Sequence, residues 1–151
     1  DIEKLYEVLK DTNILVLSDE IYSELTFNGK AHCSPASIDG MKERTVVVNG
    51  FSKAFSMTGW RLGFACGPKE LIAPMLKIHQ YAIMCAPTTS QYAAIEALRS
   101  CDNEVERMKE EYNGRKLRSQ LVIPPGKANI YLEGEMPCRL LNAYIVRPLA
   151  L

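Results

Sequence analysis

Residues 45–61 read Thr45-Val-Val-Val-Asn-Gly-Phe-Ser-Lys-Ala-Phe-Ser-Met-Thr-Gly-Trp-Arg61. The run at 45–49 is short, apolar and β-branched, which predicts a buried strand. The glycines, serines and threonine that follow it are typical of a loop. One lysine, Lys53, therefore stands at the mouth of a strand, with Arg61 eight residues further on. We interpret Lys53 as an amine held for covalent chemistry; a solvated loop lysine is the ordinary alternative.

A second apolar run precedes this stretch and is also followed by residues with ionisable side chains. Ile14-Leu-Val-Leu-Ser18 predicts a strand, and Asp19-Glu-Ile-Tyr22 follows it directly. Two neighbouring parallel strands would bring their carboxyl ends to one edge of a sheet, where α/β folds bind ligands. We therefore expect Asp19, Tyr22 and Lys53 to lie near one another. Taken singly, Asp19 could instead be an acid that caps a helix or closes a turn, and Tyr22 could be a half-buried residue of the core.

Size and charge narrow the class of protein. The chain has 151 residues, 47% of them hydrophobic, with 18 acidic and 18 basic side chains. Such a chain can form a single core, and its balanced charge provides no field that would attract nucleic acid or an anionic membrane. No apolar run approaches the roughly 20 residues of a membrane helix, and no leader opens the chain. We expect a cytoplasmic protein that binds neither nucleic acid nor membrane.

Cysteine and histidine usage gives no metal site. The five cysteines are odd in number and widely spaced, without a Cys-x-x-Cys pair. This pattern predicts reduced, mostly buried thiols rather than a zinc site or a redox pair. His32 and His79 stand far apart in the sequence and are best interpreted as packed or surface residues.

Periodicity and turn residues predict an alternation of helices and strands. Pro68 could start one helix, and Ala86-Pro87 separates it from the next. The expected helices span 1–10, 69–84, 88–99 and 102–117, and the expected strands 14–18, 45–49 and 62–66.

Two motifs are specific enough to suggest a family. Asp19-Glu-Ile-Tyr22 and Ser52-Lys-Ala-Phe-Ser-Met-Thr-Gly-Trp-Arg-Leu-Gly63 resemble the pyridoxal-phosphate-dependent aminotransferases of class I/II, the fold-type-I enzymes. The distance of 34 residues from Asp19 to Lys53, and of eight from Lys53 to Arg61, is similar to that family. The resemblance implies an α/β fold: a partial three-layer α/β/α large domain, whose mostly parallel sheet has one antiparallel strand, Leu62–Cys66.

The resemblance also implies a role for each site residue. Lys53 would form the imine with pyridoxal 5'-phosphate and afterwards serve as the base. Asp19 would keep the ring nitrogen protonated, and Tyr22 would donate to the 3'-oxygen of the ring. Arg61 and, less specifically, Ser52 would bind the phosphate.

By the same resemblance, the chain would take part in amino group transfer from an amino acid to a 2-oxo acid. The Thr-Gly-Trp-Arg variant is similar to a branch with aspartate, aromatic and N-acetyl-diaminopimelate aminotransferases. The parent would be a homodimer with residues 81–90 near its interface, and this incomplete chain alone a poor or inactive catalyst. A carbon–sulfur lyase or decarboxylase, a pyridoxal-phosphate-binding regulatory module and a non-functional remnant remain alternatives.

The resemblance fades toward the C-terminus. We assign residues 1–118 to the C-terminal part of the cofactor-binding large domain and residues 119–151 to a divergent tail. The tail has short runs punctuated by proline, such as Val122-Ile-Pro-Pro-Gly126. These runs predict no clear packed element, and a tail of different origin is our interpretation.

Overall fold

The computed structural model describes residues 2–27, 29–122 and 142–146, and side chains within these ranges as far as residue 115. In chain order, the helices and strands are α1 (Ile2–Leu9), β1 (Leu15–Asp19), β2 (Thr45–Gly50), β3 (Gly63–Cys66), α2 (Lys69–Ala82), α3 (Thr88–Ser100), α4 (Asp102–Val122) and β4 (Asn142–Val146). Short 3-10 turns cover Pro35–Ser37, Lys42–Arg44 and Thr58–Trp60. The predicted helices and the three predicted strands are therefore present, with ends displaced by a few residues.

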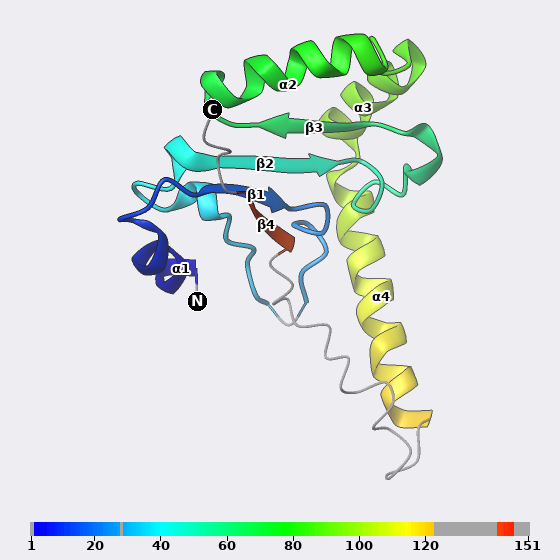
Figure 1. Cartoon of the computed structure of the whole chain (residues 1–151). Coiled ribbons are helices and arrows are strands. Elements are labelled where there is room, and N and C mark those ends of the chain that lie inside the picture. Colours follow the sequence, from blue (N-terminus) through cyan, green and yellow to red (C-terminus); the bar gives the residue numbers. More distant parts are fainter. Residues whose placement is uncertain (1, 28, 123–141, 147–151) are drawn as a thin grey trace.

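The strands form one sheet in the order β3-β2-β1-β4 (Figure 1). β1 and β2 are parallel, with Asp19 opposite Val48. β3 runs antiparallel to β2, and β4 runs antiparallel to β1. The parallel pair and the antiparallel third strand confirm the expected α/β arrangement.

One core lies where α1 meets the sheet. Leu9, Val16 and Met41 are buried together, and half-buried side chains of α1 and of the segments before β1 and β2 pack against them. The side chains of β1 alternate between half-buried and buried, as a strand with one face on a core requires. Arg44 closes the end of α1 by donating from a guanidinium nitrogen to the Leu9 carbonyl at 2.5 Å.

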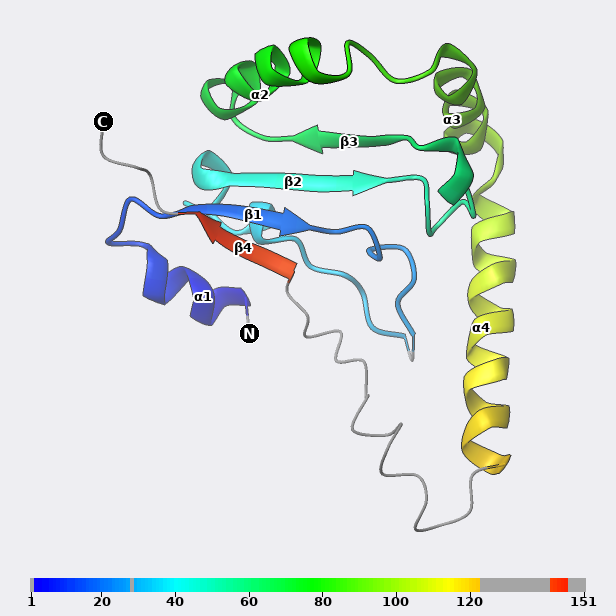
Figure 2. The same cartoon turned by 45° about the vertical axis from the view of Figure 1, so that its right-hand side comes forward.

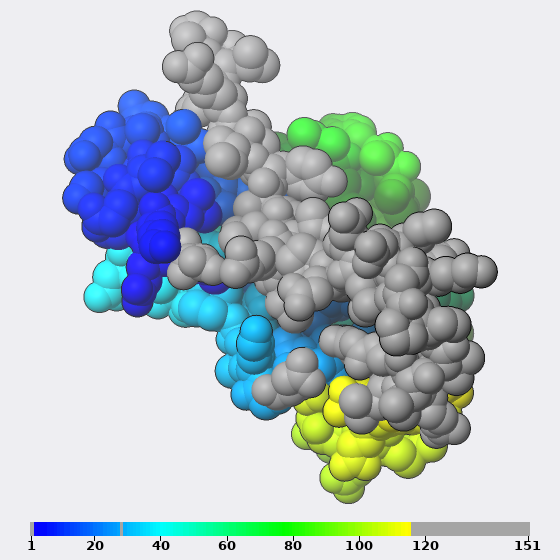
Figure 3. All heavy atoms as spheres, turned by 90° about the horizontal axis from the view of Figure 1, so that it is seen from below, coloured from blue at the N-terminus to red at the C-terminus, as the bar shows by residue number. Residues whose placement is uncertain are grey.

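A second core lies at the opposite end of the sheet. Phe51 and Met57, from the segment after β2, are buried against Ala94 and Ala97 of α3. Figures 1 and 2 both show α3 and α4 at the end toward which β1 and β2 point, with α2 along the β3 edge. Seen from below, dark-blue α1 and yellow α4 lie on opposite sides of the molecule (Figure 3). The two cores thus hold the two ends of the sheet separately.

One expectation about residues 119–151 needs correction. β4 lies within residues 119–151, where we expected no packed element, and its backbone pairs with β1 over five residues. The β-branched and aromatic run Tyr144-Ile-Val146 suits a strand, but β1 supplies the pairing partner from far away in the sequence. α4 continues through residue 118 to Val122, so the proposed boundary falls inside a helix and stays a prediction. The rest of the predicted tail, residues 123–141 and 147–151, lies outside the described residues.

The cysteines are not mostly buried. Cys33, Cys66 and Cys85 are exposed free thiols, and Cys101 is half-buried. Cys66 lies in β3, whose four residues are all exposed, and Cys85 follows α2, which has no buried residue. Cys33 lies in the loop before the first 3-10 turn. Cys138 lies outside the described residues. None of the helices in the described ranges has the length and apolar character needed to cross a bilayer.

Candidate active site

The carboxyl ends of β1 and β2 meet at one edge of the sheet. β1 ends at Asp19, and the next backbone N–H, that of Glu20, donates to the Val48 carbonyl at 2.8 Å. β2 ends at Gly50, three residues before Lys53. The parallel pairing that the sequence suggested therefore places Asp19 and the segment carrying Lys53 at the same edge.

Lys53 and Tyr22 contact each other across this edge. The half-buried Lys53 places its Nζ 5.7 Å from the centre of the Tyr22 ring. Tyr22 itself is 50% exposed, so its ring is accessible from solvent as well as from the lysine. An ammonium group within about 6 Å of an aromatic face is attracted by the ring quadrupole. The structure thus brings two of the predicted site residues together.

One carboxylate oxygen of Asp19 closes a turn, and the other is available as an acceptor. Its Oδ1 accepts a hydrogen bond from the Ile21 N–H at 3.1 Å, which closes the turn after β1. The side chain is half-buried, and within the described ranges Oδ2 has no hydrogen-bond or ion-pair partner. The turn-acid alternative is therefore correct for one oxygen, while the second oxygen remains able to pair with a cation.

The loop that carries Lys53 is held by its neighbours in sequence and by α3. The Thr58 hydroxyl donates to the Ser52 carbonyl at 2.8 Å, and the Met57 N–H donates to the Phe51 carbonyl at 3.2 Å. Ala54 is buried next to Lys53. The half-buried Lys53 thus lies in a loop whose apolar side chains Phe51, Ala54 and Met57 are buried.

Arg61 lines a groove that Lys53 does not line. Its backbone is left-handed, with φ of 52°, and one guanidinium nitrogen donates to the Thr58 carbonyl at 3.2 Å. The side chain lines an open groove of about 480 Å³ whose other lining residues are Ser56, Gly59, Trp60, Pro87, Thr89 and Ser90. No described contact joins Arg61 to Asp19, Tyr22 or Lys53, and Ser52 does not line the groove.

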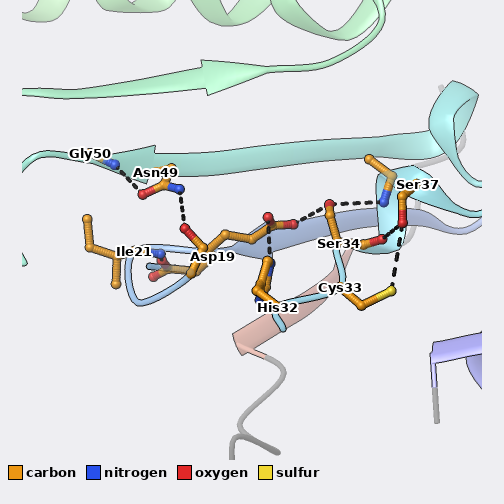
Figure 4. Close-up of polar contacts among 11 residues, drawn as sticks. Asp19, Ile21, His32, Cys33, Ser34, Ser37, Asn49 and Gly50 are labelled. Carbon is orange, nitrogen blue, oxygen red and sulfur yellow. Dashed lines mark hydrogen bonds and ion pairs between the residues drawn. The ribbon is translucent and has the colours of Figure 1, made fainter. Parts of the chain in front are cut away.

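Sequence reasoning missed two polar residues at this edge. Glu20 is buried and accepts hydrogen bonds from side chains of the 32–34 segment. Asn49 donates from Nδ2 to the Ser23 hydroxyl at 3.1 Å, and its Oδ1 accepts from the Gly50 N–H at 2.7 Å (Figure 4). A carboxylate directly after a strand was a usable signal for Glu20, because an acid at a buried register position needs partners.

No metal site accompanies these residues. Within the part of the chain that the structure describes, no three His, Cys, Asp or Glu side chains gather as metal ligands would. The chemistry available at the edge is that of an amine, a carboxylate and a phenol, with a guanidinium in the adjacent groove.

A family model for "Aminotransferase class I and II" matches residues 1–123. This chain belongs to that family. The match includes every predicted site residue and most of the described structure. The family assignment that the two motifs suggested is confirmed.

Individual proteins named as aminotransferases are similar to this chain. YugH of Bacillus subtilis is 53% identical over 116 residues, which are 77% of this chain and 30% of that protein. The aspartate aminotransferase of Pyrococcus abyssi is 44% identical over 118 residues, again 77% of this chain and 30% of the relative. The chain thus spans about 30% of the length of the curated relatives it matches.

Solved structures give the same fold. An aromatic aminotransferase from Pyrococcus horikoshii superimposes with a TM-score of 0.73 at 44% identity, covering 76% of this chain and 31% of that one. N-succinyldiaminopimelate aminotransferase from Mycobacterium tuberculosis gives a TM-score of 0.74 at 34% identity, covering 78% and 30%. The predicted fold, part of the large domain of an aminotransferase, is therefore confirmed.

Proposed function

We propose that this chain is the lysine-bearing part of a pyridoxal-phosphate-dependent aminotransferase. The observation that supports this most directly is the contact between Lys53 and Tyr22. It lies at the sheet edge where β1 delivers Asp19, in a chain that belongs to the aminotransferase family.

The donor set at this edge suits pyridoxal phosphate. The cofactor supplies an aldehyde that an amine can capture, and a pyridine ring that withdraws electrons from an attached amino acid. Lys53 is an amine without a carboxylate partner among the described residues, and Asp19 has a free carboxylate oxygen. We assign Lys53 to covalent attachment of the cofactor and Asp19 to the charge pair with its pyridine nitrogen.

Each of these residues has a further role in the proposal. The Lys53 amine, when not bound to the cofactor, would serve as the base that accepts a proton from the α-carbon of an amino acid. Tyr22 presents a phenol that can donate to an oxygen on the cofactor ring. Its ring also keeps the lysine over the sheet edge, so Tyr22 orients the amine as well.

The phosphate group is assigned to Arg61 and Ser52. Arg61 offers a guanidinium fork, and the groove that it lines also contains the hydroxyl-bearing Ser56 and Thr89. Ser52 is half-buried in the same loop as Lys53, and its hydroxyl has no partner among the described residues. In this proposal the Ser52 hydroxyl and the Arg61 guanidinium would hold the phosphate by hydrogen bonds and charge.

The substrates in our proposal are an amino acid and a 2-oxo acid. Relatives named as aspartate and aromatic-amino-acid aminotransferases, at 44% and 42% identity, support the aspartate/aromatic branch. No arginine occurs between Arg61 and Arg99. This segment therefore gives the aspartate reading no support from an arginine that would bind an acidic substrate, and it does not exclude that reading.

We further propose that the chain alone is a poor catalyst and that the parent is a homodimer. The end of α2 and the residues after it expose large apolar side chains, among them Tyr81 at 95%, Ile83 at 66% and Met84 at 77%. Exposed apolar surface of this kind is typical of an interface. It supports our assignment of residues 81–90 to the dimer contact.

Trapping of the cofactor tests the assignment of Lys53. The chain is incubated with pyridoxal phosphate, reduced with borohydride, digested and analysed by mass spectrometry. We expect the phosphopyridoxyl group on the peptide containing Lys53 and its loss in Lys53→Arg. Lys69→Arg, which changes an exposed lysine at the start of α2, should label as the unaltered chain does. Labelling spread over several lysines would contradict the proposal.

Product analysis tests the reaction class. With a full-length relative carrying this segment in place of its own, an amino acid and a 2-oxo acid are supplied together. Transamination transfers the amino group to the second substrate, so isotopic nitrogen from the first should appear in the new amino acid. Release of sulfide or carbon dioxide without that transfer would instead favour the lyase or decarboxylase alternative.

A further inference from the structure

The carboxylate of Glu20 is the centre of a polar cluster beside the proposed site. Glu20 is only 7% exposed. The Ser34 hydroxyl donates to its Oε1 at 2.5 Å, and His32 Nε2 lies 2.8 Å from its Oε2 (Figure 4). Each carboxylate oxygen therefore has a partner from the segment 12 to 14 residues further along the chain. We call Glu20, His32 and Ser34 the Glu20 cluster.

Such a cluster costs stability unless its geometry is satisfied. A carboxylate is rarely buried, because it loses hydration that only direct hydrogen bonds can replace. An apolar residue would fill this position without that requirement. No buried side-chain polar atom of the described residues lacks a partner. The Glu20 cluster is thus fully satisfied, a condition under which a buried polar network fixes one conformation.

The position of Glu20 connects this cluster to the site. Successive side chains of an extended chain point to opposite faces, so Glu20 anchors the end of β1 from the side opposite Asp19. The Glu20 carbonyl accepts from the Ser23 N–H at 2.9 Å, and the Tyr22 carbonyl accepts from the Leu25 N–H at 3.0 Å. Tyr22 therefore lies in a turn that begins at the anchored residue.

We propose that Glu20 is a positioning residue that fixes the turn presenting Tyr22 to Lys53. In this proposal Glu20 does not contact the lysine or the cofactor. It acts through its hydrogen bonds to His32 and Ser34, which fix the orientation of the backbone at the end of β1. The consequence for cofactor binding rests on the function proposed above, whereas the consequence for the turn does not.

The first experiment uses the chain without cofactor. Amide hydrogen exchange is followed by NMR at Ile21 and Ser23, whose N–H groups bond within the turn. In Glu20→Ala we expect both amides to exchange at least tenfold faster, while amides of β2 stay within twofold. Glu24→Ala removes an exposed carboxylate from the same turn and should leave the exchange unchanged. Unaltered exchange in Glu20→Ala would overturn the proposal.

A milder pair of variants covers the case in which Glu20→Ala does not fold. Ser34→Ala removes one hydroxyl donor and leaves His32 in place, and we expect about threefold faster exchange at Ile21 and Ser23. Ser37→Ala removes a hydroxyl that donates to the Ser34 carbonyl and not to Glu20, so it is the matched control. Equal exchange rates in these two variants would overturn the proposal.

The second experiment separates positioning from general stability. Pyridoxal phosphate affinity is measured for Glu20→Ala, for Tyr22→Leu and for the double variant. We expect Glu20→Ala to weaken binding about tenfold in the unaltered chain and at most twofold when Tyr22 is already absent. Equal weakening in both backgrounds would show that Glu20 does not act through Tyr22. If the unaltered chain binds no pyridoxal phosphate, the proposed function fails, and the exchange rates still decide the role of Glu20.

Discussion

The two segments that follow the parallel strands are held in place by different forces. Residues 20–25, after β1, are fixed by side-chain hydrogen bonds through Glu20 and Asn49. Residues 51–60, after β2, also have hydrogen bonds within the loop, but three of their apolar side chains are buried, Phe51, Ala54 and Met57. Hydrogen bonds depend on individual atoms and directions, whereas apolar burial depends on volume. The segment with Tyr22 should therefore respond to single polar atoms, and the segment with Lys53 to changes in size.

The largest expected effect comes from removing a large side chain from the core formed by residues 51–60, which we call the lysine loop, and α3. Phe51 is 6% exposed and contacts the rings of Phe55 and Phe64. We expect Phe51→Ala to lower the free energy of unfolding by about 3–5 kcal/mol, measured by urea denaturation. Phe64→Ala, at a ring that is 45% exposed, should cost clearly less. Similar losses of unfolding free energy in the two variants would contradict the view that buried side-chain volume stabilises this loop.

Adding volume at the start of the same loop should cost somewhat less. A Cβ on Gly50 would lie 2.9 Å from both the Gly63 Cα and the Leu62 carbonyl oxygen, which are backbone atoms. We expect Gly50→Ala to destabilise the chain by about 1–3 kcal/mol, visible as a lower urea midpoint. At Gly59 a Cβ would meet nothing within 4 Å, so Gly59→Ala serves as the control. A neutral Gly50→Ala would mean that β2 and β3 separate easily at this point.

The corresponding test for the polar segment removes one amide. Asn49→Ala loses the bonds to the Ser23 hydroxyl and to the Gly50 N–H. We expect a loss of about 1–2 kcal/mol, with faster amide exchange at Ser23 than at Met57. Ser23→Ala removes only the first bond, and its smaller effect on the same two amides provides the comparison. Exchange that rises equally in both segments would show that the two are coupled.

The smallest effect is expected at a hydrogen bond between α3 and residues 51–60. The buried Ser90 hydroxyl donates to the Trp60 carbonyl at 2.7 Å and so joins α3 to the end of the lysine loop. Ser90→Ala should cost about 1 kcal/mol and change the emission of Trp60, the single tryptophan of the chain. Ser100→Ala, exposed at the other end of α3, should change neither. A larger loss than in Asn49→Ala would reverse the order of the two segments.

Much of the fold followed from local patterns in the sequence. The β-branched run at 45–49 and the apolar run at 14–18 predicted β2 and β1, because short buried strands have that composition. The parallel pairing then placed Asp19 beside the loop of Lys53. β4 was missed because its pairing with β1 depends on a contact between distant parts of the chain, which no local pattern contains.

The candidate site was predictable only in part. The types of side chain were readable, and the contact between Lys53 and Tyr22 follows from parallel strands. Sequence patterns did not indicate the left-handed backbone of Arg61, which directly follows the 3-10 turn Thr58–Trp60, or the groove that its side chain lines. The roles of Glu20 and Asn49 were also missed, because their partners are set by tertiary structure.

The position of β4 has a consequence for how the protein is made. Leu15 of β1 lies opposite Val146 of β4, so this pair can form only after Val146 has left the ribosome, long after Leu15 has done so. β2 and β3 are translated much earlier and can occupy the other side of the sheet in the meantime. Until then, the backbone groups along the outer edge of β1 are open to a neighbouring nascent chain. Misassembly during translation should therefore begin at β1.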